Sequence, residues 1–389
     1  MTIAVVVISA TVLAQWVPQA PNPSLWPYAD GPTVEVVALP HVNYRSGTAV
    51  GWYEGSPSLF VGGGVNLVTY SRDLPGTDPK YWGNRQSGFS IYTPGFGWVS
   101  ADGTDDINNG DGTWTSVGLT GYNNGKGTNS PLVGEGTGYV ADQAFFYGTS
   151  FYIFGGYPQW GGNMAKYDTL TNAWSNVALG DSDGLYNTGG GGLIGSTWYK
   201  VHKAGFLMAY DASSDAWLPD VAVAGLPAPA IFAASGAIGS NLIIVDTDAA
   251  GGAVYVIDPS NGTFTTGASA PTPVREAGSV VYNGKFYLLG GRAGSTPDLA
   301  IDLIQIYDPA NDSWAISSVK LPSARSGFVA EVIGDTLYFG NGLDTATTAV
   351  DDFWQISMAQ VAVPIPEPGT ILLIGTGLFG MLFLKRRKK

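Results

Sequence analysis

Cysteine is absent from this chain of 389 residues, and histidine occurs only twice, as His41 and His202. Without cysteine the chain can form no disulfide, thiolate nucleophile, Cys-ligated zinc site or iron–sulfur cluster. Two histidines leave little material for a His-based metal site or for a Ser–His–Asp arrangement. The four glycines at 189–192 lack the following lysine and helix that a phosphate-binding loop requires. The sequence therefore offers no recognisable catalytic centre.

Charged side chains are also scarce, at 13% of the chain against roughly 25% in an average soluble domain. Acidic residues outnumber basic ones by 31 to 18, and the net charge is −13. The last five residues are all basic, so residues 1–384 hold 31 acidic and 13 basic residues, a net charge of −18. Because such a body repels phosphate groups, we predict no nucleic-acid partner.

Glycine and aromatic residues are abundant instead, with 55 glycines and 12% aromatic side chains. Aromatic and β-branched residues favour strands, while Gly, Asn, Asp and Pro supply the backbone angles of tight turns. Long stretches rich in Ala, Glu, Lys and Leu, which would favour helices, are missing. We therefore predict an all-β body.

The N-terminal end contains an apolar run, residues 3–14, that finishes at Val12-Leu13-Ala14. Its length and small final residue are typical of a signal peptide rather than of a spanning helix, although the usual basic residues ahead of it are missing. We predict a signal peptide at 1–14 and a lead segment at 15–32. A buried first strand at Val5-Val6-Val7-Ile8 is the alternative.

The C-terminal end has three consecutive parts: Pro366-Glu367-Pro368, an apolar segment at 370–384, and the basic cluster Lys385-Arg386-Arg387-Lys388-Lys389. A helix over the apolar segment would span about 22 Å, a length that a bilayer accommodates by local thinning. We predict a transmembrane helix there, with the basic cluster in the cytoplasm and the body across the membrane. An ordinary single-pass anchor has the same features.

These three parts, in this order at the C-terminus, resemble the PEP-CTERM sorting signal. The resemblance covers the tail alone. It implies processing by an exosortase, a membrane enzyme of Gram-negative bacteria. It also implies an exported protein that is passed on to the cell surface or the extracellular matrix.

A turn motif recurs through the middle of the chain. An aromatic or aliphatic residue and an aspartate end one strand, a polar turn follows, and a second aromatic residue begins the next strand. The copies are Tyr167-Asp168 with Trp174, Tyr210-Asp211 with Trp217, Ile257-Asp258 with Phe264, and Tyr307-Asp308 with Trp314. Successive copies are 43, 47 and 50 residues apart, and strands that end in Gly-Gly lie upstream, at 151–156 and 286–291.

A hydrophobic strand ending in Gly-Gly, then a Tyr and then a Trp, resembles the kelch motif, in which steps of about 50 residues each make one four-stranded propeller blade. The resemblance implies a β-propeller over 33–360, followed by a linker at 361–369. Counting the units gives six blades, or seven if the insertion around Trp114 is the remnant of another. We expect the strand Thr33–Leu39 to complete the sixth blade and close the ring.

Three arginines occupy one place in the repeat, shortly after a proline and before the first strand of a unit: Arg45, Arg275 and Arg325. Their units are neighbours in a closed six-bladed ring. Together they could bind a carboxylate or a sulfate, so they are our candidate binding residues. The simpler alternative is that each arginine pairs with a nearby aspartate or carbonyl. Glu276 and Glu331 are either acid–base partners or ordinary surface residues.

The acidic stretch 102–111 offers oxygen ligands of the kind that calcium prefers, in Asp102, Asp105, Asp106, Asn108 and Asp111. Their spacing matches no defined calcium loop, and solvated turns are the simpler interpretation. We predict no metal and no cofactor, with calcium at this stretch as the alternative.

Two functions are compatible with these features. The sorting tail and the lack of catalytic residues favour an exported, non-enzymatic propeller that binds a polysaccharide or a surface protein. Kelch propellers include enzymes, however, and the fold alone does not decide the function. Galactose oxidases need a copper held by His and Tyr and a cross-linked Cys, which this chain cannot supply. The alternative is a carbohydrate-acting enzyme, similar to sialic-acid mutarotases or to a lyase, that would use Arg45, Arg275 and Arg325.

Overall fold

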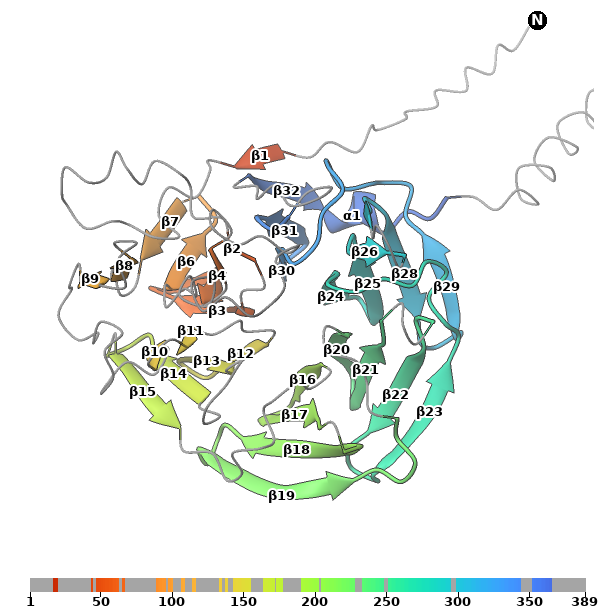
Figure 1. Cartoon of the computed structure of the whole chain (residues 1–389), viewed down its shortest axis with the longest axis horizontal. Helices are drawn as coiled ribbons and strands as arrows, with labels where there is room; N and C mark the ends of the chain where they lie inside the picture. Colours follow the sequence, from red (N-terminus) through yellow and green to blue (C-terminus); the bar gives the residue numbers. More distant parts are fainter. Residues whose placement is uncertain are drawn as a thin grey trace, which may run out of the picture.

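The computed structural model of the chain describes residues 47–62, 89–95, 97–100, 143–154, 164–171, 173–177, 190–202, 204–227, 233–247, 251–294, 299–343 and 352–365, and short strands at 17–19, 43–44, 65–66, 106–108, 114–116, 133–134 and 137–138. Within these ranges the backbone forms six four-stranded antiparallel sheets and four two-stranded ones. Figure 1 shows the larger sheets around a common axis, as the blades of a propeller. The all-β prediction is confirmed.

The first five large sheets each take their strands from one continuous part of the chain, beginning at the axis and ending at the rim. Sheet 1 contains β3 (Gly47–Tyr53), β4 (Ser56–Gly62), β6 (Phe89–Thr93) and β7 (Gly97–Ser100). Sheet 2 contains β12 (Ala144–Tyr147), β13 (Ser150–Phe154), β14 (Met164–Asp168) and β15 (Ala173–Val177). Sheet 3 contains β16 (Gly191–Ile194), β17 (Thr197–Val201), β18 (Phe206–Asp211) and β19 (Ala216–Ala222). Sheet 4 contains β20 (Ala234–Ile238), β21 (Asn241–Val245), β22 (Val254–Asp258) and β23 (Thr263–Gly267). Sheet 5 contains β24 (Gly278–Tyr282), β25 (Lys285–Leu289), β28 (Ile304–Asp308) and β29 (Ser313–Ile316).

Sheet 6 joins the beginning and the end of the propeller. It contains β30 (Val329–Ile333), β31 (Thr336–Gly340) and β32 (Phe353–Ser357), and β1 (Val17–Gln19) pairs antiparallel with β32 at the rim. An N-terminal strand therefore closes the ring, as predicted, and covers a sheet edge that would otherwise be exposed. The segment we predicted for this place was wrong, since 17–19 occupies it and 33–39 lies outside the described residues. A three-residue strand is too short to show an alternating pattern in sequence.

The repeated aspartates fold the turns between the two outer strands of sheets 2 to 5. In each turn the aspartate carboxylate accepts a hydrogen bond from the backbone N–H two residues later, the geometry of an Asx turn. The four bonds join Oδ1 of Asp168, Asp211, Asp258 and Asp308 to the amides of Leu170 at 2.7 Å, Ser213 at 3.0 Å, Ser260 at 2.9 Å and Ala310 at 3.0 Å. The motif read from the sequence is therefore a turn motif.

The repeated tyrosines fill the layers between neighbouring sheets. Tyr210 of β18 is fully buried, and its ring lies 5.8 Å from the ring of Tyr152 in sheet 2 and 5.2 Å from that of Trp217 in its own sheet. Tyr307 is equivalent in sheet 5 and packs against Trp314, with 5.1 Å between the ring centroids. The hydrophobic core is thus a series of aromatic and aliphatic layers between blades rather than one central mass.

The glycine pair of the repeat is required where sheets 5 and 6 meet. Gly290 and Gly291 adopt φ values of +55° and +93°, which favour glycine. A Cβ on Gly291 would lie 2.9 Å from the carbonyl oxygen of Arg275, and one on Gly290 would lie 2.8 Å from that of Arg325. The amide of Gly291 donates to this Arg325 carbonyl at 2.9 Å. The two glycines therefore let the backbones of adjacent units approach closely enough to bond.

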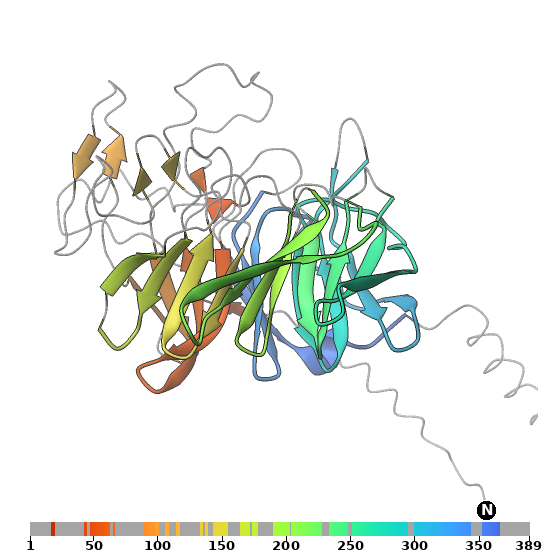
Figure 2. The same cartoon turned by 90° about the horizontal axis from the view of Figure 1, so that it is seen from below.

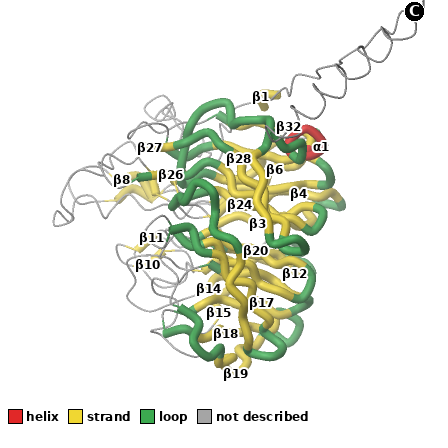
Figure 3. Tube along the Cα trace, turned by 90° about the vertical axis from the view of Figure 1, so that its right-hand side faces the viewer, coloured by secondary structure: helices red, strands yellow, loops and turns green. Residues whose placement is uncertain are grey.

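Four two-stranded sheets lie on one face of the ring, which we call the loop face. They are β2 (Asn43–Tyr44) with β5 (Val65–Asn66), β8 (Asp106–Asn108) with β9 (Trp114–Ser116), β10 (Val133–Gly134) with β11 (Thr137–Gly138), and β26 (Arg292–Ala293) with β27 (Leu299–Ala300). Figures 2 and 3 show them gathered on the side opposite the helix α1 (Met358–Val361). The described part of the insertion around Trp114 forms the strand pair β8–β9 and not a further blade. The kelch-type tryptophan of sheet 1 is Trp98, which pairs with Tyr92.

The helix α1 and the residues after it fasten the end of the propeller to sheet 5. Ser357 caps the helix, and the amide of Met358 donates to Asp335 in the β30–β31 turn at 2.8 Å. Pro364 then bridges to Ser317, and the amide of Ile365 donates to the carbonyl of Ile316 at 2.8 Å. Over the ranges given above, no helix is long and apolar enough to cross a membrane. The predicted transmembrane segment 370–384, Pro366-Glu367-Pro368 and the basic cluster lie outside the described residues.

Candidate functional site

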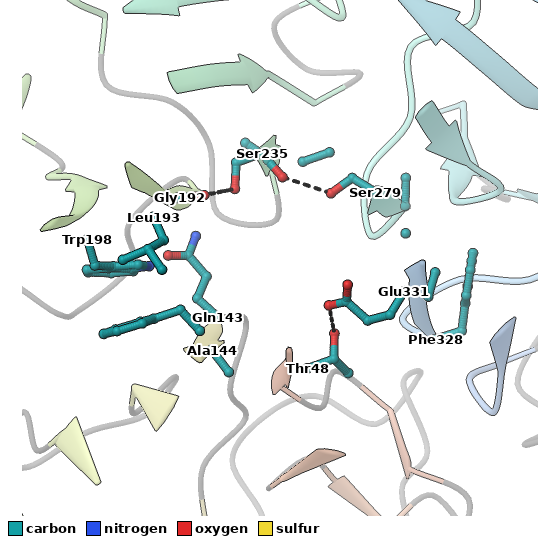
Figure 4. A pocket seen from close by; sticks show the side chains of 17 residues that line it. Thr48, Gln143, Ala144, Gly192, Leu193, Trp198, Ser235, Ser279, Phe328 and Glu331 are labelled. Atoms are coloured by element: carbon teal, nitrogen blue, oxygen red, sulfur yellow. Dashed lines mark hydrogen bonds between the residues drawn. The ribbon is translucent and has the colours of Figure 1, made fainter. Parts of the chain in front are cut away.

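A cavity of about 200 Å³ lies where the innermost strands of the six large sheets meet (Figure 4). Every one of these strands contributes to its wall, mainly with small or polar residues from its first half. In each sheet the first strand ends at the turn on the α1 face, as Asp335 shows in sheet 6. The cavity therefore lies toward the loop face. Its polar lining residues are Thr48, Gln143, Ser235, Ser279 and Glu331.

Three hydroxyl groups of the wall use their protons within the protein. Oγ1 of Thr48 donates to Oε1 of Glu331 at 2.8 Å, and Oγ of Ser279 donates to the carbonyl of Ser235 at 3.1 Å. Oγ of Ser235 donates to the carbonyl of Gly191 at 2.9 Å and accepts from its amide at 2.8 Å. These bonds tie sheet 1 to sheet 6, sheet 5 to sheet 4 and sheet 4 to sheet 3. The same contacts that shape the cavity therefore hold neighbouring blades together.

Glu331 is the one ionisable side chain among the described residues of the wall. Burial raises the pKa of its carboxyl from 4.5 to about 7, and the hydrogen bond from Thr48 offsets only part of this effect. Thr48 belongs to β3 and Glu331 to β30, so their hydrogen bond crosses the seam where the ring closes. A carboxyl group that is half ionised near neutral pH thus faces the axis of the propeller (Figure 4).

Gln143 precedes β12 and enters the cavity from the side opposite Glu331 (Figure 4). Its Oε1 is buried and has no hydrogen-bond donor among the described residues. This oxygen faces Gly191, where a Cβ would lie 2.6 Å from it, so it is enclosed by the wall.

Most of this wall was not predicted from the sequence. Of its polar residues only Glu331 was considered, and then with a surface residue as the alternative. A spacing signal was present, since Gly191, Ser235 and Ser279 follow one another at intervals of 44 residues, one per blade, and bond across the intervals. The residue types differ from blade to blade, however, and a search for repeated residues passes over such positions.

Arg325, one of the three candidate binding residues, is paired through the two terminal nitrogens of its guanidinium group. The side chain is fully buried, and both terminal nitrogens bond to the carboxylate of Asp352, with Nη2 at 2.8 Å from Oδ2. Nη1 also donates to the carbonyl of Asn341 at 3.1 Å, and the group stacks over Phe339 at 4.4 Å from the ring centroid. This is the simpler alternative from the sequence analysis, in which the arginine pairs with an aspartate and a carbonyl.

The other two candidate arginines do not join Arg325 in one described site. Arg275 is half-buried, forms an antiparallel backbone bridge with Arg292, and directs Nη1 toward the carbonyl of Gly294 at 3.4 Å. Arg45 lies outside the described residues. Glu276, the second acidic candidate, is 5% exposed with φ +56°, and its carbonyl accepts from the amide of Gly327 at 2.8 Å. The surface interpretation of Glu276 was therefore wrong.

No group of three or more His, Asp or Glu side chains that could hold a metal is found where the structure is described. Most of the acidic stretch 102–111 falls outside that part, apart from the strand Asp106–Asn108. Calcium at this stretch therefore stays a prediction.

Comparison with known families decides what the repeat and the tail are. Residues 273–317 match the Kelch motif. They comprise sheet 5 and its approach, including Arg275, the pair Gly290-Gly291, Tyr307 and Trp314. Residues 364–388 match the PEP-CTERM protein-sorting motif. Both resemblances identified from the sequence are confirmed, and the sorting motif implies export, processing by an exosortase and sorting to the cell surface.

Two known proteins are similar to this chain. The Kelch-like protein terF of Aspergillus terreus (strain NIH 2624 / FGSC A1156) is 22% identical over 267 residues, which are 59% of this chain and 57% of that protein. The chain thus matches little more than half the length of this relative. Among solved structures, the structure of YjhT matches with a TM-score of 0.51 and 14% identity, over 85% of this chain and 96% of that one. This likeness concerns the fold alone.

Proposed function

We propose that the chain is an exported, non-enzymatic six-bladed propeller of a Gram-negative bacterium, which presents its loop face to an extracellular polysaccharide. One observation carries the proposal: the loop face and the helix α1, which precedes the tail, lie on opposite sides of the ring (Figures 2 and 3). The sorting motif begins at residue 364, and the last described hydrogen bond before the tail, from Ile365 to Ile316, ties that point to sheet 5.

The placement of α1 and the loop face on opposite sides of the ring favours presentation of the loop face to the surroundings of the cell. A chain held by residues 370–384 in a membrane, or by the processed end of its tail, would carry α1 toward the anchor and the insertions between strands away from it. A closed ring of sheets is a rigid support for the two-stranded sheets of the loop face. The acidic body, with a net charge of −18 over residues 1–384, favours neutral or cation-bridged glycans over strongly anionic ones.

The contacts of Arg325 favour a non-enzymatic binding protein over a carbohydrate-acting enzyme. The enzymatic alternative needs three guanidinium groups available to an anionic substrate, and the Arg325 group is buried, bonded twice to Asp352 and stacked on Phe339. Extracting it from this pairing would leave a buried charge without a partner, which is strongly unfavourable.

The proposal is tested by site-specific labelling of the full chain with and without extracellular polysaccharide from the producing bacterium. Because the natural chain has no cysteine, a single introduced cysteine gives a single label. Leu299→Cys places it in β27 on the loop face, where Leu299 is 57% exposed, and Leu170→Cys places it in the β14–β15 turn on the α1 face, where Leu170 is 79% exposed. We expect polysaccharide to slow maleimide labelling at position 299 and to leave position 170 unchanged.

Equal protection of both positions, or of neither, would contradict binding through the loop face. If the full chain is retained by matrix material after glycan digestion but not after proteolysis of that material, the partner is a surface protein and the polysaccharide proposal is refuted.

A further inference from the structure

The central cavity presents hydrogen-bond acceptors to a ligand. Thr48, Ser235 and Ser279 all commit their hydroxyl protons to bonds within the wall, so toward the cavity they can only accept. Oε1 of Glu331 receives the Thr48 hydrogen bond, while Oε2 has no hydrogen-bond donor among the described residues. A ligand that fits this wall must therefore supply hydrogen-bond donors.

The charge of the wall further restricts which ligands the cavity can bind. Its ionisable group is the carboxyl of Glu331, held in surroundings that disfavour the negative charge. A positively charged donor would compensate that charge, and an anion would be repelled by it. Charge-assisted hydrogen bonds to a desolvated carboxylate are about twice as strong as neutral ones.

The size of the cavity indicates a small group. About 200 Å³ is the volume of roughly six or seven water molecules at their share of liquid volume, and it lies below the usual range for pockets that bind drug-sized ligands. A small free amine fits these dimensions, as does the amino end of a larger molecule that enters from the loop face.

We propose that the central cavity binds a primary ammonium group, which donates hydrogen bonds to the carboxylate of Glu331 and to the hydroxyl oxygen of Ser279. The two residues belong to the neighbouring sheets 6 and 5, and both side chains face the cavity (Figure 4). The site does not depend on the loop face binding a polysaccharide, and either proposal can fail without the other.

The experiment compares three probes of nearly equal size on the full natural chain: ethanolamine, ethylene glycol and glycolate, at matched ionic strength. They differ in one end group, which is an ammonium, a neutral hydroxyl or a carboxylate. Thermal unfolding is followed at about pH 8, where the Glu331 carboxyl is ionised, and the rise of Tm with probe concentration gives an apparent Kd. We expect ethanolamine to raise Tm in a saturable way and the other two probes to leave it unchanged.

The variant Glu331→Gln keeps the shape of the side chain and its hydrogen bond with Thr48 but removes the charge. We expect it to weaken ethanolamine binding about tenfold or more. Glu54→Gln is the matched control, because Glu54 is exposed in the β3–β4 turn, outside the cavity. We expect this variant to bind ethanolamine with the same affinity as the natural chain. A response to ethylene glycol or glycolate equal to that of ethanolamine would overturn the proposal, and so would equal binding by Glu331→Gln or no response to ethanolamine. The probe comparison on the natural chain decides the matter even if Glu331→Gln fails to fold.

Discussion

Replacing Glu331 by glutamine should stabilise the protein at alkaline pH and leave its stability unchanged at acid pH. The pKa of this carboxyl is about 7 in the folded chain against 4.5 as the ordinary value, because burial disfavours the charge. Between these two values the folded state binds more protons than the unfolded state, so the contribution of Glu331 to stability is present below pH 4.5 and is lost as pH rises through 7.

The magnitude follows from the shift in pKa. At 1.36 kcal/mol per unit, a rise from 4.5 to about 7 corresponds to about 3 kcal/mol at pH 8. This is an upper value, since Glu331 faces a cavity that water can enter. The described residues that face the carboxyl contribute no second charge: Thr48 comes from β3, Ser279 from β24, and Tyr338 is opposite in β31.

The assay is guanidinium-induced unfolding of the natural chain and of Glu331→Gln at a series of pH values from about 4.5 to 8. Other carboxyl groups titrate equally in both proteins, so the difference in unfolding free energy isolates Glu331. It should be near zero at the acid end and should grow to as much as about 3 kcal/mol in favour of the variant at pH 8. A difference that is flat with pH, or a variant that is less stable at pH 8, would refute the assignment of a raised pKa. Glu54→Gln should show no such trend, since Glu54 is exposed.

Three further substitutions test how the ring is held together, each by the change in unfolding free energy. Gly291→Ala should cost about 2–3 kcal/mol, because φ is +93° and the new Cβ would lie 2.9 Å from the Arg275 carbonyl. The control Gly294→Ala should cost about 1 kcal/mol, because φ is +90° but the space around the new Cβ is open. Equal costs would show that the close approach to the Arg275 carbonyl does not matter. Arg325→Met should cost about 3 kcal/mol by leaving Asp352 without its partner, and an unchanged midpoint would mean that the pair is not formed in solution. Tyr307→Phe should cost about 1 kcal/mol through loss of the 2.8 Å hydrogen bond to Asp312. The cost is small because Oδ1 of Asp312 still accepts a hydrogen bond from the amide of Ala268 at 2.6 Å. A cost above about 3 kcal/mol would point to a packing role for the hydroxyl.

The architecture could be predicted from the sequence because its determinants are local. Asp211 folds its own turn with the amide of Ser213, and Tyr210 is brought opposite Trp217 by that turn, all within eight residues. Repetition of such a unit at intervals of 43 to 50 residues leaves few possible folds. The Kelch and PEP-CTERM motifs could be identified for the same reason, since each is a short contiguous pattern.

The closing strand and the partner of Arg325 depend instead on contacts between distant parts of the chain. Val17–Gln19 pairs with a strand more than 330 residues away, and nothing in three residues identifies that partner. Arg325 bonds to Asp352, 27 residues later and across a turn, so the choice between a pairing arginine and a binding arginine required coordinates. The central cavity could not be predicted for the same reason, because its wall is assembled from between one and four residues of each of the six blades.

The comparison of Arg325 with Glu331 shows why these two kinds of residue should be read differently in a repeat protein. A residue type that recurs at one place in several units can serve the structure of the blades, as Arg325 does through Asp352 and as Gly290-Gly291 do where sheets 5 and 6 meet. On the innermost strands, Thr48, Ser235, Ser279 and Glu331 differ in type from blade to blade, and all four line the central cavity. Their variation sets the chemistry of the one space that all six sheets share. A buried carboxyl group at one of these places is therefore a better guide to a ligand than three arginines in register.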